Sequence, residues 1–286
     1  MTVVVTPDAL TITAPEPRKR RRGWGWTAGG VAIIVVMLFP VYWMLNVSLQ
    51  PAGSAVGTSL FPFHLSFAGY AKALNDQGGH LATSLIIALG SVVFSLLIAA
   101  PAAYGLALFR IKWADAMLLG ILISQMIPGI VVANALYSIY NDIGLLNTVG
   151  GLILADSTAG IPFAMLILRA FMMSLPTSVI EAAAVDGAGA VRTFVSIVLP
   201  MCRNAIVSAG LFTFLFTWGD FLFALTLTTT QDVRPVTLGI FMYLGTYVND
   251  WSSVMATAVM ASIPAIVLLV VAQRYVAAGV TAGAVK

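Results

Sequence analysis

Six long apolar segments dominate the pattern of hydrophobic and polar positions, at roughly residues 29–49, 82–108, 116–139, 149–171, 205–228 and 256–275. A bilayer core about 30 Å thick is crossed by a helix of about 20 apolar residues. Backbone N–H and C=O groups find no partner in lipid, so such segments must be helices rather than open strands. The pattern predicts an all-α integral membrane protein with six transmembrane helices.

Prolines fall inside four of these segments: Pro101, Pro128, Pro162 and Pro264. Each would break a helix in a soluble protein. Neighbouring helices in a membrane bundle can satisfy the freed backbone groups, so bends are tolerated there. We therefore expect helices that curve around a cavity.

Composition supports a lipid environment and excludes several functions. Hydrophobic residues make up 60% of the chain and charged residues 9%, whereas a soluble domain has about 25% charged residues. The single Cys202 cannot form an internal disulfide, and the two histidines are sixteen residues apart, so no metal site is expected. No stretch carries a basic face, so nucleic acid is not an expected partner.

Basic residues indicate how the chain crosses the cytoplasmic (inner) membrane, because they accumulate on the cytoplasmic side. If residues 1–27, a basic arm expected to be disordered, are cytoplasmic, then only Lys72 and Arg234 of the fourteen basic residues lie outside. A secretory signal is a poorer explanation, because 29–49 is long and five more spans follow. We expect a membrane domain over 28–280, a tail at 281–286 and both termini in the cytoplasm.

This topology puts the connections 50–81, 140–148 and 229–255 outside and leaves one long cytoplasmic loop, 172–204. Loops longer than about 12–15 residues are usually functional or disordered. The periodicity predicts a short helix over 179–185, a turn at Gly187 and Gly189, and a second helix over 190–198 closed by Pro200. One side of the second helix would carry Val191, Phe194, Val195 and Val198. Such helices could dock on a protein or lie on the membrane surface.

A specific spacing in this loop carries a family resemblance. Glu181-Ala182-Ala183, then Gly187, then Ile197-x-Leu199-Pro200 resembles the EAA loop of ATP-binding-cassette (ABC) import permeases. The resemblance implies coupling helices that sit in a cleft of an ATPase subunit. It would place Glu181 against a basic group and the bend at Gly187. The implied coupling residues are Glu181, Ala182, Ala183, Asp186, Gly187, Ile197, Leu199 and Pro200.

Other segments are similar to the maltose-type carbohydrate branch of that family, including 143–148, Trp218-Gly219-Asp220-Phe221 and the ending 273–286. Gly219 stands where many relatives carry Asn, and Asn204 where many carry Pro. This resemblance implies import of a sugar, expected to be a di- or oligosaccharide, with a non-sugar solute such as glycerol phosphate as the alternative. It also implies a second permease subunit, two copies of an ATPase and an extracellular or periplasmic sugar-binding protein.

No G-x-x-x-x-G-K-[ST] phosphate loop occurs, so this chain is expected to bind no cofactor and to be no enzyme, with ATP and Mg on partner subunits. An ion-driven secondary transporter is a rival, but it would need internal repeats and an embedded ion site. An intramembrane enzyme would need convergent catalytic groups. Neither requirement is visible in the sequence.

Candidate path residues lie in the third and fifth predicted spans. A charge such as Asp220 costs at least ~2.5–3.5 kcal/mol at the centre of a membrane helix, so it should face the bundle interior or water. Asp220 beside Trp218 is interpreted either as a path-lining carboxylate or as a packing group. Asn134 and Tyr137 could contact a sugar or only pack.

Aromatic and acidic residues gather in the predicted outer loop 229–255. By resemblance this loop reaches into the binding protein, which implies contacts from Tyr243, Tyr247, Asp250 and Trp251. The alternative for the aromatic residues is an interfacial belt.

Overall fold

The computed structural model describes residues 24–51, 60–61, 64–109, 111–246 and 250–284. The chain divides into two units, Met1–Trp43 and Met44–Lys286. The first unit contains most of α1 (Trp24–Ser48), which begins inside the predicted arm. Pro40 lies within α1, a bend position that the sequence prediction omitted. Apolar residues are exposed all along this helix, as in a membrane span.

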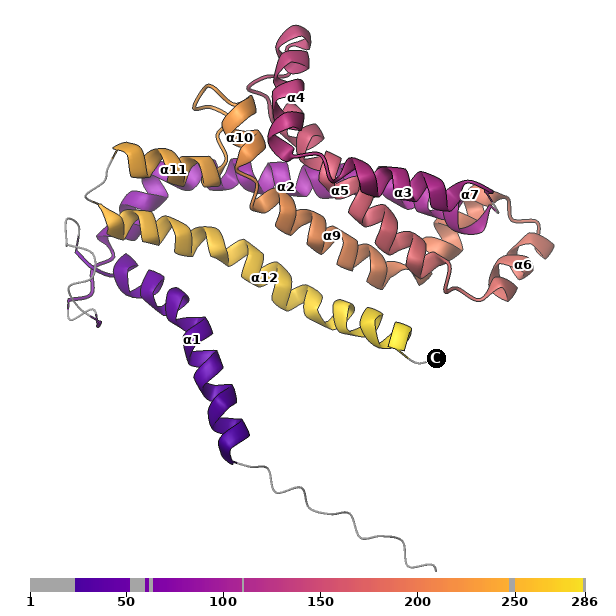
Figure 1. Ribbon diagram of the computed structural model, residues 1–286, viewed down its shortest axis with the longest axis horizontal. Coiled ribbons are helices and arrows are strands. Elements are labelled where there is room, and N and C mark those ends of the chain that lie inside the picture. Colours follow the sequence, from indigo (N-terminus) through magenta and orange to yellow (C-terminus); the bar gives the residue numbers. More distant parts are fainter. Residues whose placement is uncertain (1–23, 52–59, 62–63, 110, 247–249, 285–286) are drawn as a thin grey trace, which may run out of the picture. The chain divides into compact units, whose positions relative to one another are not determined.

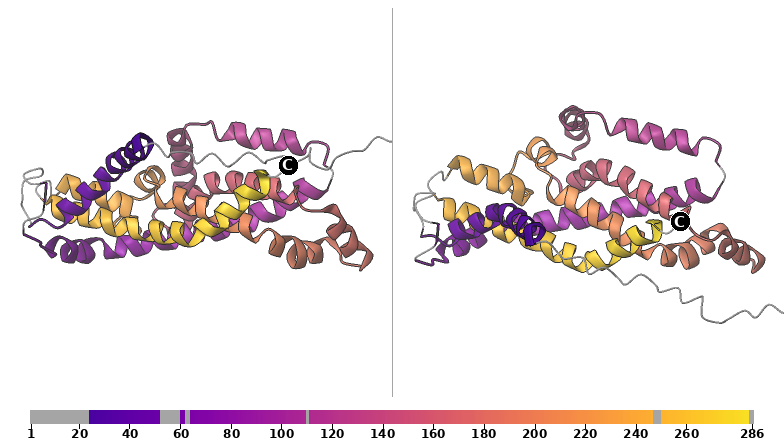
Figure 2. Two further views of the ribbon diagram at one scale, coloured as in Figure 1. Left: turned by 90° about the horizontal axis from the view of Figure 1, so that it is seen from below. Right: turned by 60° about the horizontal axis from the view of Figure 1, so that its bottom comes forward.

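Long helices pack side by side in the second unit: α2 (Ala68–Leu108), α5 (Val149–Met172), α9 (Arg203–Trp218) and α12 (Trp251–Ala284). α2 packs against α5, α9 and α12, and α9 packs against α5 and α12. Figures 1 and 2 show this arrangement, with α6 (Thr177–Val185) at one end of the unit and α11 (Val236–Thr246) toward the other.

Small residues allow the close approach of these helices. A Cβ atom on Gly160 of α5 would lie 2.7 Å from both Ser95 Oγ on α2 and Thr213 Cγ2 on α9. A Cβ atom on Gly90 would overlap the Ile153 side chain. Membrane helices associate through such contacts because lipid offers no hydrophobic driving force between them.

Two predicted spans are broken. The predicted span 116–139 consists of α3 (Ala114–Ser124) and α4 (Gly129–Ile143), which meet at 89°. Pro128 is the residue before α4, with φ −56° and ψ 129°. Proline disfavours the helical conformation for the residue that precedes it, so α3 ends before Pro128. The predicted span 205–228 consists of α9 and α10 (Leu222–Leu227), with a break at residues 219–221. A bend was predicted at Pro128, whereas none was predicted within 205–228.

Helices also extend into the predicted outer loops. α2 begins at Ala68, within the predicted loop 50–81, while α11 and the start of α12 occupy part of 229–255. Hydropathy marks only the apolar part of a helix, so the more polar stretch 68–81, which contains Lys72, was missed. α11 is fixed on α2, since Ser84 Oγ accepts a hydrogen bond of 2.8 Å from the Val236 amide.

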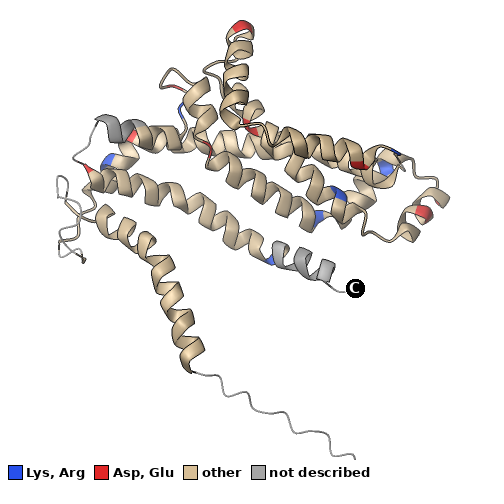
Figure 3. Cartoon of the chain, in the orientation of Figure 1, with Lys and Arg blue, Asp and Glu red and all other residues tan. Residues whose placement is uncertain are grey.

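By length and composition, four helices among the described residues could cross a membrane, or up to six if two bent pairs, α3 with α4 and the segment 190–201 with α9, each count as one span. Charged residues in the second unit gather near the helix ends, and the middles of α2, α9 and α12 carry none (Figure 3). Large apolar residues on these helices are widely exposed. This distribution is the one that a lipid environment requires.

Buried residues of the second unit form three cores. The first core joins α2, α3, α5, the segment 190–202 and α9, and includes Ala103, Tyr104, Leu168 and Val198. The second core joins α2, α4, α5 and α10 through Ile87, Tyr140, Leu152, Ala155 and Leu227. The third core contains Ala88, Phe214 and Trp218.

Candidate functional site

The predicted cytoplasmic loop is a folded helical element. α6 is followed by a tight turn in which Gly187 has φ 75°, the left-handed conformation that glycine adopts without strain. The amides of Asp186 and Ala188 donate to the carbonyls of Ala182 and Ala183 at 3.0 and 2.9 Å and close the turn. The chain then enters α7 (Ala190–Thr193).

The second part of this element departs from the prediction. α7 continues through a π-helical turn, η1 (Phe194–Val198), into α8 (Leu199–Met201), so Pro200 does not close the helix at 198. Proline donates no N–H, and its ring would clash with the carbonyl four residues earlier in a regular α-helix. The wider turn, in which the Leu199 amide donates to the Phe194 carbonyl, accommodates it. The segment 190–201 then meets α9 at 77°.

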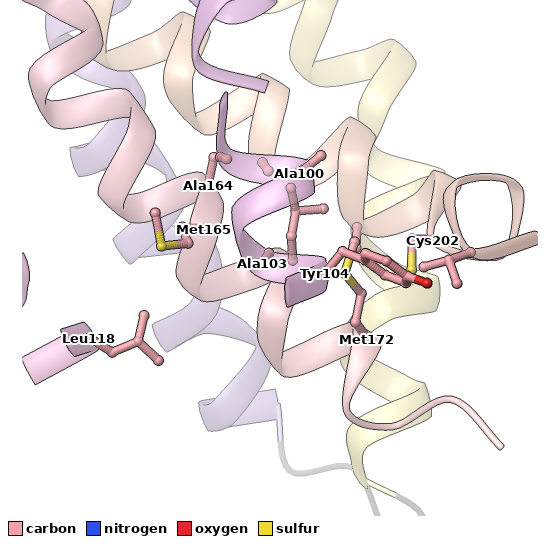
Figure 4. Close-up of a cluster of buried hydrophobic side chains, with 13 residues drawn as sticks. Ala100, Ala103, Tyr104, Leu118, Ala164, Met165, Met172 and Cys202 are labelled. Carbon is pink, nitrogen blue, oxygen red and sulfur yellow. The ribbon is translucent and has the colours of Figure 1, made fainter. Parts of the chain in front are cut away.

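Contacts with the first core hold this element rigidly. Tyr104 of α2 donates a hydrogen bond of 3.2 Å from its hydroxyl to the Ala190 carbonyl, and its ring lies 5.0 Å from the Phe194 ring. Val198 and Cys202 are fully buried. Figure 4 shows Tyr104 near Cys202 and Met172, with Ala103 on the same helix. Motion of this element must therefore be transmitted to α2 and α5.

An apolar surface remains exposed on the element. Phe194 and Val198 face the core, whereas Val185, Val191 and Val195 are 87%, 77% and 53% exposed. The expected single apolar side of the second helix is thus divided between core and surface. Five predicted coupling residues are also exposed: Glu181, Ala182, Asp186, Gly187 and Pro200. Of the other three, Ala183 is buried and Ile197 and Leu199 are half-buried.

The predicted path residues Trp218 and Asp220 point to different neighbours. Trp218 is buried, stacks on Phe214 at 5.4 Å and donates from Nε1 to the Ala261 carbonyl of α12 at 3.0 Å. Asp220 lies in the break, where its carboxylate accepts from the amides of Phe223 and Ala224 at 3.4 and 3.1 Å. It caps the start of α10. The geometry favours the packing alternative for Trp218 and gives Asp220 a structural task.

Asn134 and Tyr137 are exposed on α4. Neither residue lines the cavity of about 580 Å³ that lies where the breaks meet the middle of α5. The cavity is lined by Ile121, Ser124, Gln125, Ile127, Gly129, Val132, Thr158, Ala159, Ile161, Pro162, Met165 and Phe223. Pro128 and Pro162 were the available signal for this cavity, because both mark places where helices bend.

Predicted contact residues in the outer loop are only partly described. The side chain of Tyr243 and all of Tyr247 lie outside the described residues. Trp251 is half-buried at the start of α12. Asp250 accepts hydrogen bonds from Lys72 Nζ, Ser252 Oγ and Ser253 Oγ at 2.7, 3.1 and 2.9 Å.

Electrostatics favour a structural role for Asp250. Burial acts to raise the pKa of its carboxyl, but the hydrogen bonds from Lys72 and the two serines outweigh burial and hold the pKa below its usual value. The Lys72–Asp250 ion pair joins the start of α2 to the start of α12. Gly69 makes that approach possible, since a Cβ atom there would lie 3.0 Å from the Ser252 backbone.

Within the described residues, no group of three or more His, Cys, Asp or Glu side chains is arranged to hold a metal ion. The geometry instead consists of a rigid exposed helical element at one end of the second unit and a cavity between broken helices.

Comparisons with known proteins agree with that description. Residues 95–282 match the family described as binding-protein-dependent transport system inner membrane component. The diacetylchitobiose uptake system permease protein DasC of Streptomyces coelicolor is 30% identical over 260 residues, covering 90% of this chain and 94% of DasC. The trehalose/maltose transport system permease protein MalG of Thermococcus litoralis is 31% identical over 265 residues, covering 90% and 95%.

A solved structure shares the fold. One chain of a bacterial ABC transporter involved in the import of the acidic polysaccharide alginate aligns with a TM-score of 0.74 at 22% identity. The alignment covers 92% of this chain and 100% of that chain.

Proposed function

Because the chain belongs to the family of binding-protein-dependent transport system inner membrane components, we propose that it is one permease subunit of an ATP-driven sugar importer. The observation that carries this proposal is the element α6–α8, which is locked to the first core and exposes Val185, Val191 and Val195. A rigid element with an exposed apolar surface suits docking on a second protein.

The proposed substrate is a di- or oligosaccharide. DasC and MalG, each matched over 90% of this chain, are named for the uptake of diacetylchitobiose and of trehalose or maltose. Sugar recognition is expected to be shared with a second permease subunit and with a sugar-binding protein that delivers the solute.

In the proposed topology the chain crosses the membrane six times, with α3–α4 and α9–α10 as broken spans. The α6–α8 element lies in the cytoplasm, as do both termini. Arg169 and Arg203 flank that element and Arg192 lies within it. All three support this orientation, since basic residues accumulate on the cytoplasmic side. The element is then the EAA coupling loop.

The proposed transport mechanism is alternating access. Two ATPase subunits bind ATP and Mg, close on each other and move α6–α8. Tyr104 and Val198 transmit that motion to α2 and α5, because neither contact surface can deform without losing close packing. The two permease subunits then expose their shared cavity to one side of the membrane at a time, and hydrolysis resets them.

Sugar uptake into membrane vesicles, with and without the ATPase, tests the proposal. Glu181→Lys should leave the protein inserted but lower uptake by about tenfold or more, because it reverses the charge at a docking surface. Asp142→Lys, at an exposed acid on α4, is the matched control and should retain uptake. Normal uptake in Glu181→Lys would remove the coupling role, and uptake that persists without ATPase would refute the importer.

A second variant separates the two functions of Asp220. Asn caps helices about as well as Asp, but Asp220 accepts from the Phe223 amide with one carboxylate oxygen and from the Ala224 amide with the other, so Asp220→Asn removes the charge and keeps one of these two acceptors. An altered transport rate in an intact complex would support a path role. Wild-type rates would leave Asp220 as a helix cap.

A further inference from the structure

One side chain joins the turn between α4 and α5 to the segment after α10. Asn147 Oδ1 accepts hydrogen bonds from the amides of Thr229 and Thr230 at 2.6 and 3.0 Å. Its Nδ2 donates to Thr229 Oγ1 at 3.0 Å. The backbone amide of Asn147 donates to the Leu227 carbonyl at 3.1 Å. We name this set of contacts the Asn147 clamp.

The backbone of Asn147 is arranged for these contacts. Its φ is 57°, the left-handed region, where asparagine is one of the few non-glycine residues found repeatedly. This conformation aims the amide group away from the turn and at Thr229. The side chain thus bonds across 82 residues of sequence instead of within its own loop.

The turn does not need the Asn147 side chain for its own shape. Gly144, with φ 73°, ends α4. Thr148 Oγ1 donates to the Leu145 carbonyl at 2.8 Å and accepts from the Gly151 amide at 2.9 Å, which caps α5. The polar groups of the Asn147 side chain are therefore committed to the other segment.

The Asn147 clamp connects the two segments that follow the helix breaks. α4 follows the break at Pro128, and α10 follows the break at 219–221. Tyr140 of α4 and Leu227 of α10 share the second core, and Gly129 approaches Leu222 so closely that a Cβ atom would lie 3.0 Å from Cδ2. α4, the turn and α10 therefore pack together beside the cavity of about 580 Å³.

On the premise of the permease function, we propose that Asn147 is a positioning residue for transport. It holds the start of the segment 228–235 on the α4–α5 turn, so that docking of the binding protein on the outer loop moves α10 and α4 together. Without the clamp, α10 and its loop move while α4 stays behind, and the signal is lost before it reaches the cavity.

Two substitutions at Asn147 separate the side chain from the backbone. Asn147→Gly tolerates the left-handed conformation and removes the side-chain bonds. Asn147→Asp keeps the acceptor for the Thr229 and Thr230 amides, replaces the Nδ2 donor with a second oxygen and adds a negative charge. Thr229→Ala keeps its amide bond and serves as a mild control.

Hydrogen exchange in the assembled complex tests the clamp itself. Loss of a hydrogen bond worth about 1 kcal/mol raises exchange by about fivefold. Asn147→Gly should show that increase at the Thr229 and Thr230 amides, and Asn147→Asp should stay close to wild type. Equal protection in all three proteins would overturn the proposal.

ATPase activity of the reconstituted complex tests the positioning role, titrated with sugar-loaded binding protein. Asn147→Gly should lower the ratio of maximal stimulated to unstimulated rate by about fivefold or more. The half-maximal concentration of binding protein should change less than that ratio, and Asn147→Asp should restore most of the stimulation. A purely structural defect would instead lower both rates in proportion.

A stimulation ratio in Asn147→Gly equal to that of wild type would overturn the proposal, whether both rates are unchanged or both fall in proportion. Failure of the importer assignment is a different result, since the wild-type complex would then show no stimulation by any loaded binding protein.

Discussion

The first and second cores hold the same helices, α2 and α5, by different means. In the first core, the apolar side chains of Leu168 and Val198 and the Tyr104 ring pack across the 77° bend at Cys202 and hold the segment 190–201, which bears Val191 and Val195. Around the second core the helices are interrupted, and polar groups such as Asn147 and Asp220 hold the pieces together. Close packing transmits displacement as a rigid body, whereas breaks bridged by hydrogen bonds permit two arrangements. In the proposed mechanism, the first core therefore suits transmission of motion from α6–α8, and the second core suits opening and closing of the transport path.

The largest expected effect is a buried charge in the first core. Val198→Asp should destabilise the protein by about 4 kcal/mol, because an unpaired carboxylate would replace a fully buried side chain. Val195→Asp, one turn away and 53% exposed, should leave the fold intact. Thermal unfolding of the purified variants in lipid nanodiscs measures both. Equal melting temperatures would show that the first core is not closely packed.

A steric pair at the start of α5 probes the second core. A Cβ atom on Gly151 would overlap the Leu145 carbonyl, whereas one on Gly150 meets nothing within 4 Å. Gly151→Ala should cost about 1–3 kcal/mol through overpacking. Gly150→Ala should instead stabilise by about 0.5 kcal/mol by restricting the unfolded chain. Melting temperatures that shift alike would contradict the close turn at 144–148.

A smaller effect is expected for the hydrogen bond between α2 and α7. Tyr104→Phe keeps the ring against Phe194 and removes the bond to the Ala190 carbonyl, at a cost of about 1 kcal/mol. Tyr137→Phe, at an exposed ring on α4, is the control. Faster hydrogen exchange over residues 190–198 in the first variant alone would support rigid seating. Unchanged exchange would show that packing suffices.

The smallest effect concerns pH at the joined starts of α2 and α12. The folded pKa of Asp250 lies below its usual value, so its contribution to stability is complete above about pH 3.9, the ordinary carboxyl pKa. It is lost as the pH falls through the lower folded pKa. Asp250→Asn should remove this part of the acid dependence of the melting temperature. An unchanged dependence would place the acid-sensitive group elsewhere.

Much of the architecture was predictable, because lipid leaves few choices for apolar segments. The segment 149–171 predicts α5 (Val149–Met172) closely, and the pattern at 179–185 predicts α6. Pro128 predicted a bend in its span, but the break at Gly219 was missed, since hydropathy averages over a window and does not register backbone geometry. The role of Trp218 was not predictable either, because no sequence pattern shows that its Nε1 donates to the Ala261 carbonyl.

By itself the sequence determined the class of protein, the family resemblance and the position of the helical loop 172–204. Apolar length, basic-residue asymmetry and the spacing from Glu181 to Pro200 are local properties that survive without a fold. Only the tertiary structure decided which valines of that loop are free and where the cavity lies. It alone showed that Asn147 reaches Thr229, because that contact depends on how two helix breaks turn segments distant in sequence toward each other.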